Sequence, residues 1–219
     1  HRYSSAASDV YKRQGIWGGE NRRYATIKFI LYTVFGSVFI FIGTVYTAVI
    51  SYGTNRALAL DFDTLANLEF SSSQSRTLFL LFTFGFLIKV PLFPLHTWLP
   101  DAHVEAPTAG SILLAGVLLK VGAYGILRVS IPFFTEGFIT YKNLIAVLSV
   151  IGIIYGAIVA IAQIDIKKLI AYSSVSHMGY VMLGISAGGY LSIEGAIIQM
   201  INHGITSGCL LYTSDAADE

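Results

Sequence analysis

The sequence contains very little cysteine and little charge. Its 219 residues include one cysteine, Cys209, and charged residues make up 12% of the chain, against roughly 25% in a soluble domain. A single cysteine excludes an internal disulfide framework. The net charge of +1 gives no electrostatic reason to bind nucleic acid. One cysteine and no dinucleotide fingerprint predict that the chain holds no iron–sulfur cluster, flavin or nicotinamide of its own, and no Cys or His spacing matches a metal site.

Hydrophobic residues are abundant instead. They form 54% of the chain, and the mean hydropathy is +0.66. Six segments approach the roughly 20 apolar residues that a bilayer-crossing helix needs. These segments cover residues 25–50, 77–98, 107–129, 142–164, 168–187 and 193–212. The composition therefore predicts an all-α, polytopic membrane helix bundle whose first partner is the lipid bilayer.

The two ends differ from the rest in composition. Residues 1–14 and 213–219 are polar and do not continue the apolar pattern. The start has no apolar core followed by a small-residue cleavage site, so it does not read as a signal peptide. We expect both ends to be foreign sequence, the first of them disordered, around a transmembrane domain at 15–212.

Basic residues give the expected orientation. They cluster before the first span and between the fourth and fifth spans, at Arg22, Arg23, Lys28, Lys167 and Lys168. With this order of spans, both positions lie on one face of the membrane. The positive-inside rule places that face in the cytoplasm.

Two lysines lie within predicted spans. Lys120 is near the middle of the third span and Lys89 follows a long apolar run in the second. A lysine at the bilayer centre costs at least about 2.5–3.5 kcal/mol, so such a residue is usually functional. Folding the hairpin between the two spans puts each lysine about 15 residues, or about 23 Å of helix, from the turn. We therefore expect equal depth on facing helices; the alternative is a lysine that snorkels to water from a helix end.

Four histidines repeat this pattern. His96 and His103 are seven residues apart, on one face if their helix is continuous, while His177 and His203 lie symmetrically about the turn near residue 190. The second pair should face the bundle interior at matching depth, close to other polar groups. Histidine exchanges protons near neutral pH, so these residues are candidate proton carriers. The alternative is a packed, hydrogen-bonding role.

Prolines interrupt the second span. Pro91, Pro94 and Pro100 each remove a backbone donor, which predicts a broken helix between about Pro91 and Glu105. A broken helix beside a buried lysine is how ion-translocating proteins build a polar cavity at the midplane. The alternative is a simple kink. Asp101 and Glu105 at the same junction either take part in the site or are solvated turn charges.

The stretch "KVPLFPLHTWLPDAHVEAPTAGSILLAGVLLKVGAYGILR" resembles the antiporter-like, proton-pumping membrane subunits of respiratory complex I (NADH:quinone oxidoreductase), most closely their chain 4 (bacterial chain M) branch. "IWGGENRRYATIKFILYTVFGS", "AQIDIKKLIAYSSVSHMGYVMLG" and "INHGITSGCLLY" resemble later blocks of the same subunits in the same order. The resemblance covers about residues 15–212. It implies a fourteen-helix subunit built around two inverted repeats of five helices, of which this chain would supply the sixth to eleventh.

The resemblance also implies roles for individual residues. Lys89 corresponds to the lysine of the broken helix that ends the first half-channel, and Lys120 to the central connecting lysine. Four histidines resemble members of the polar axis that relays protons along the midplane in the family: His96, His103, His177 and His203. The glutamate that pairs with the broken-helix lysine in the family lies on a helix that the sequence does not include.

As a function, the resemblance implies proton translocation driven by redox chemistry elsewhere. NADH, FMN, iron–sulfur clusters and quinone would be handled by partner subunits, and the partners would be other membrane and peripheral subunits of complex I. A bacterial inner membrane is expected, with the mitochondrial inner membrane as the alternative.

Three other functions compete with this one. Subunits of multi-chain sodium/proton antiporters and of membrane-bound hydrogenases share the pattern of Lys89 and Lys120. A solute transporter would need a substrate cavity rather than a file of titratable residues. A scaffold would tolerate apolar residues in place of both lysines.

Overall fold

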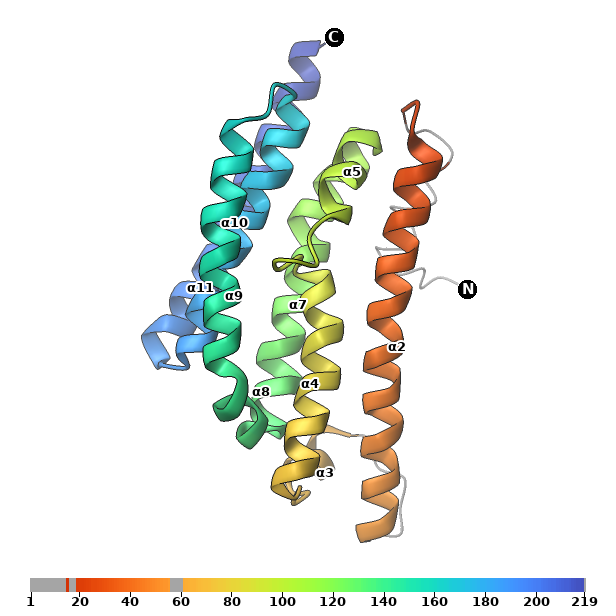
Figure 1. Ribbon diagram of the computed structural model, residues 1–219, viewed down its shortest axis with the longest axis vertical. Helices are drawn as coiled ribbons and strands as arrows, with labels where there is room; N and C mark the ends of the chain where they lie inside the picture. The colour runs from red at the N-terminus through yellow and green to blue at the C-terminus, as the bar shows by residue number, and fades with distance from the viewer. Residues whose placement is uncertain (1–14, 16–18, 56–60, 219) are drawn as a thin grey trace.

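The computed structural model describes residues 15, 19–55 and 61–218, and within these ranges it is helical without strands. The predicted all-α bundle is therefore confirmed, and its long helices run side by side (Figure 1). The helices are α2 (Arg22–Asn55), α3 (Phe62–Ala66), α4 (Ser72–Lys89), α5 (Trp98–Glu105), α6 (Thr108–Leu113), α7 (Leu119–Gly125), α8 (Ile131–Phe133), α9 (Thr135–Ile161), α10 (Ile166–Ala187) and α11 (Tyr190–Asp218), with π-helical turns η1 (Leu114–Leu118) and η2 (Ile126–Ser130).

Among the described residues, three helical stretches are long and apolar enough to cross a membrane: Arg22–Gly53, Thr108–Phe133 and Thr135–Ile161. They match the first, third and fourth predicted spans. The helices α10 and α11 contain 22 and 29 residues, about 33 and 44 Å at 1.5 Å per residue, which is long enough to span. Serine, histidine and glutamine side chains lower their hydropathy.

The second predicted span is not one helix. Helix α4 ends at Lys89 and α5 begins at Trp98, so the predicted interruption is confirmed and a continuous helix over 77–98 is wrong. Prolines inside this stretch cannot donate to the helical ladder. The Trp98 side chain instead donates from Nε1 to the carbonyl oxygen of Ile88 at 3.0 Å, which pairs one of the carbonyls freed at the end of α4.

Glycines allow α4 to pack closely on both sides. A Cβ at Gly85 would lie 2.5 Å from the carbonyl oxygen of Gly36 on α2. A Cβ at Gly122 on α7 would lie 2.7 Å from the carbonyl oxygen of Phe86. Only glycine permits backbones to approach this closely, which is typical of helix pairs in membranes. Helix α4 is thereby held between α2 and α7.

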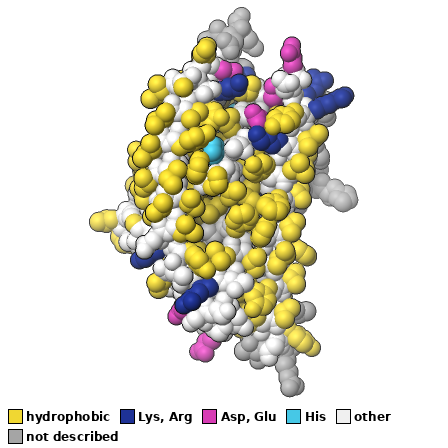
Figure 2. All heavy atoms as spheres, viewed as in Figure 1, with side chains coloured by type: hydrophobic (Ala, Val, Ile, Leu, Met, Phe, Trp, Pro, Cys, Tyr) yellow, Lys and Arg dark blue, Asp and Glu magenta, His cyan; other side chains and the backbone are white. Residues whose placement is uncertain are grey.

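The start of α2, helix α5 and the start of α10 meet at one end of the bundle. A small pocket there is lined by residues from all three, including Tyr24, Asp101 and Lys168. The basic residues at the starts of α2 and α10 therefore lie on the same face, as the sequence predicts. Figure 2 shows apolar side chains over the middle of the molecule and charged ones towards its ends.

The predicted foreign start, residues 1–14, lies outside the described residues. The predicted foreign tail begins at residue 213. Helix α11 continues past this position through Asp218, so no helix boundary coincides with the start of the tail.

Candidate functional site

Lys89 and Lys120 lie at similar depth on neighbouring helices. Gly122 fits between Phe86 and Val90, the residues that bracket Lys89 at the end of α4. Lys120 is two residues from Gly122, a rise of about 3 Å. The predicted equal depth is therefore confirmed. Lys89 is partly buried, and its side chain makes no hydrogen bond to the part of the chain that the structure describes.

Lys120 contacts a histidine on another helix. Its Nζ lies 2.6 Å from Nδ1 of His203 on α11 and also donates to the carbonyl oxygen of Ala115. Ala115 belongs to η1, one of two π-helical turns that flank Lys120. Such turns occur mostly at functional sites. Here the turn offers a carbonyl five residues before the lysine, so the ammonium is partnered within the bundle.

His203 in turn lies beside His177. The ring centroids are 5.5 Å apart, and Nδ1 of His177 lies 3.2 Å from Nε2 of Gln199. The two histidines thus share one depth, as predicted. His203 is buried with 4% of its surface exposed, whereas His177 is exposed and lines a hollow between α10 and α11. The prediction that both side chains face the bundle interior is therefore correct for His203 and wrong for His177. The spacing of two residues about a turn fixes their depth along the helices but not the direction in which each side chain points.

His96 and His103 do not share a helix face. His96 precedes α5 and His103 lies within it, so the continuous helix on which that expectation depended is absent. His96 sits among aromatic rings, with its centroid 5.0 Å from that of Tyr155, 5.6 Å from that of Phe93 and 6.4 Å from that of Tyr172.

His103 is fully buried, and neither ring nitrogen has a hydrogen-bond partner among the described residues. A buried polar group of this kind is normally satisfied by protein or by ordered water. Within the described residues, ordered water is therefore the partner open to its ring nitrogens.

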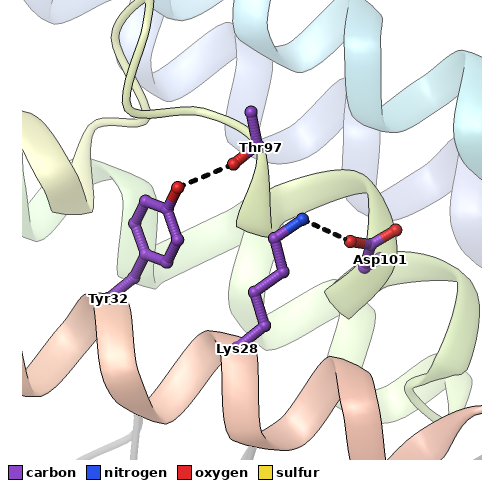
Figure 3. A network of polar contacts seen from close by, with 4 residues as sticks. All are labelled: Lys28, Tyr32, Thr97 and Asp101. Carbon is purple, nitrogen blue, oxygen red and sulfur yellow. Dashed lines mark hydrogen bonds and ion pairs between the residues drawn. The ribbon is translucent and has the colours of Figure 1, made fainter.

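Asp101 and Glu105 are not merely solvated turn charges. Asp101 forms an ion pair with Lys28 of α2, with 2.7 Å between Oδ2 and Nζ. One turn away, the hydroxyls of Tyr32 and Thr97 are 2.8 Å apart (Figure 3). Glu105 accepts a hydrogen bond from the backbone N–H of Asn21 at 3.0 Å. Asp101 thus links α5 to α2, and Glu105 links it to the residue just before α2.

Sequence reasoning missed several of these contacts. Asp101 pairs with Lys28, 73 positions away, and the ring of His96 packs on that of Tyr155, 59 positions away. No local sequence pattern predicts either contact. The π-helical turns also lack a distinctive signature in "LAGVLLKVGAYG". The involvement of Gln199 could have been predicted from its spacing. It lies four residues before His203, which places both side chains on the same face of one helix. No group of three or more metal-ligating side chains occurs in the described ranges.

Comparison with known proteins places these contacts in a family context. The family model described as NADH:quinone oxidoreductase/Mrp antiporter, transmembrane, matches residues 14–217. The chain is 49% identical over 203 residues to NADH-quinone oxidoreductase subunit M of Rhodobacter capsulatus, covering 90% of this chain and 40% of that protein. The chain thus spans well under half the length of this relative.

Two solved structures have a similar fold. A chain of respiratory complex I from Thermus thermophilus with bound NADH is 31% identical, with a TM-score of 0.87 over 94% of this chain and 43% of that one. A chain of the Mrp complex from a Dietzia species shares the fold, with a TM-score of 0.77 over 92% of this chain and 37% of that one, at 21% identity.

Proposed function

Because the chain belongs to the NADH:quinone oxidoreductase/Mrp antiporter family of membrane proteins, we propose that it is a proton-translocating part of the membrane arm of an NADH:quinone oxidoreductase. The relative at 49% identity is a subunit of that enzyme, and the solved chain at 31% identity belongs to a respiratory complex I. Similarity to the Mrp complex is limited to the fold. These differences favour complex I over a sodium/proton antiporter.

The observation that carries the proposal is the contact between Lys120 Nζ and His203 Nδ1 at 2.6 Å. At this distance the proton on the ammonium can pass to the imidazole nitrogen, leaving a neutral amine and an imidazolium. The reverse transfer restores the starting pair. His177 stands next along α10 and α11 at a centroid distance of 5.5 Å, which one ordered water can bridge. Protons would therefore move along the bundle from Lys120 to His203 and His177.

The other site residues complete the path in this proposal. Lys89 would deliver protons at the broken end of α4. His103, buried without protein partners for its ring nitrogens among the described residues, would hold the water that connects α5 with Lys120. His96, in its aromatic surroundings, would exchange protons nearer the end of the bundle where α5 meets α2 and α10. Each of these steps moves one proton between nitrogen or water oxygen atoms and needs no other reactant.

The proposal assigns the redox chemistry to partner subunits. They would bind NADH, FMN, iron–sulfur clusters and quinone, while this chain lies in the lipid bilayer among other membrane subunits. The bacterial relative favours a bacterial inner membrane.

The test is the Lys120→Ala variant in the complete subunit, assembled in native membranes. Loss of the group between the hairpin and the later histidines should abolish proton pumping, and NADH:quinone turnover should fall with it if the two are coupled. Assembly should remain near normal, because alanine in an apolar span removes a desolvation cost. Lys142→Ala on α9 is the matched control and should pump normally. Full pumping by Lys120→Ala would refute the proposal.

A further inference from the structure

The segment between Lys89 and Glu105 depends on its neighbours for its position. Residues 90–97 lie outside any helix, and α5 has only eight residues. An isolated helix of this length is not stable by itself. The placement of His96 and His103, which this segment carries, must therefore come from contacts with other elements.

Helix α2 supplies an ordered set of these contacts. Lys28 pairs with Asp101, and Tyr32 pairs with Thr97. The members of each pair are four residues apart on their own segment, so the two contacts are one helical turn apart, about 6 Å, and run antiparallel. Figure 3 shows both contacts reaching from α2 to the start and the first turn of α5. This spacing fixes rotation as well as distance.

Further contacts extend the same register in both directions. The rings of Phe29 and Trp98 stack between the two polar pairs, with centroids 5.0 Å apart and planes inclined at 28°. Beyond Asp101, the carboxylate of Glu105 accepts from the N–H of Asn21. One face of α5 is therefore held by α2 and by the residue that precedes it.

His96, on this segment, contacts helices other than α2. His96 is adjacent to Thr97 but packs against Tyr155 of α9 and Tyr172 of α10. His103 is two residues from Asp101 and fully buried. Figure 1 shows α5 between α2 and the pair α9 and α10. A movement of the segment 96–105 that broke the Lys28–Asp101 pair would carry both histidines away from their surroundings.

We propose that Lys28 and Asp101 are positioning residues, which clamp the broken-helix segment against α2 and so hold His96 and His103 in register with Lys120. The ion pair suits this role, since its side chains are 22% and 36% exposed. The two charges are partly shielded from water, so their attraction is stronger than that of a fully exposed pair, and both remain accessible to water. The inference about proton movement rests on the proposed function, whereas the clamp itself is a statement about structure.

The test uses the complete complex and two measurements. Hydrogen–deuterium exchange reports the position of the segment, and protons pumped per NADH report function. Lys28→Met keeps the apolar stem and removes the charge. Exchange over residues 92–106 should rise about fivefold, the factor expected when a partly buried ion pair is lost, and protons per NADH should fall below about half.

Companion variants separate positioning from general stability. Lys28→Arg keeps the charge and should behave as the parent. The exchanged pair Lys28→Asp with Asp101→Lys should restore both measurements. Lys142→Met on α9 should change neither. Faster exchange confined to 92–106, with recovery in the exchanged pair, supports the clamp.

Unchanged exchange over 92–106 in Lys28→Met, exchange raised throughout the subunit, or no recovery in the exchanged pair would each overturn the proposal. So would normal pumping by Lys28→Met in a complex in which Lys120→Ala fails to pump. If Lys120→Ala pumps normally while Lys28→Met still loosens 92–106, the proposed function fails and the clamp stands.

Discussion

Lys89 and Lys120 lie at similar depth on neighbouring helices, yet the backbone around them differs. Lys89 is the last residue of α4, where the chain leaves the helix for eight residues. A helix C-terminus favours a cation because its carbonyl dipoles point outward. Lys120 lies inside a helical stretch that continues from Thr108 to Phe133. It has no helix end nearby.

The surroundings of Lys120 stabilise its ammonium group in a different way. Two π-helical turns flank Lys120, and one of them supplies the carbonyl of Ala115, while α11 supplies His203. A lysine at a helix break thus depends on the end of its own helix, and a lysine within a helix depends on a local change of helical pitch and on a neighbour. Of these two lysines, Lys120 alone contacts a proton-accepting side chain within the described residues.

The largest effect on stability is expected where the two regions touch. Gly122→Leu would place a Cβ 2.7 Å from the carbonyl oxygen of Phe86 and 3.0 Å from the backbone nitrogen of Val90. Backbone atoms at a helix end cannot move aside cheaply, so we expect a loss of about 3 kcal/mol. The yield of assembled complex and its thermal unfolding midpoint should both fall.

Gly116→Ala is the control for this substitution, because a Cβ at Gly116 meets nothing within 4 Å. Its assembly and unfolding midpoint should be unchanged. A Gly122→Leu complex that assembles fully and unfolds at the parent temperature would contradict the close packing of α7 on the end of α4.

A smaller effect is expected at the break itself. Trp98→Phe preserves a ring to stack on Phe29 but removes the donor to the Ile88 carbonyl. An unpaired buried carbonyl costs about 1–3 kcal/mol, so the unfolding midpoint should fall modestly. Tyr52→Phe, at an exposed position of α2, should leave it unchanged. An unaltered midpoint in Trp98→Phe would show that the break does not need this bond.

Much of this architecture could be predicted from the sequence, because bilayer physics limits the choices. Apolar length predicts helices, prolines predict the break before Trp98, and counting from the hairpin predicts that Lys89 and Lys120 share a depth. The same counting places His177 beside His203. Each of these inferences uses distance along a helix axis, which 1.5 Å per residue fixes closely.

Rotation about helix axes could not be predicted in the same way. His177 is exposed rather than interior, and His96 is separated from His103 by the start of α5, since both outcomes depend on which neighbours pack where. The partner of Asp101 was likewise hidden, because Lys28 lies 73 positions away on another helix. Long-range side-chain pairs require the folded arrangement and leave no periodic trace.

The central claim is that Lys120 must release a proton to His203 and not merely carry a charge. Lys120→Arg in the complete, assembled complex tests it most directly, because arginine preserves the charge and the donors but is not deprotonated in proteins. Proton pumping per NADH is the measurement, made beside Lys142→Arg as a control for the substitution itself. The account predicts that Lys120→Arg assembles normally and does not pump, whereas pumping at the parent rate would contradict it.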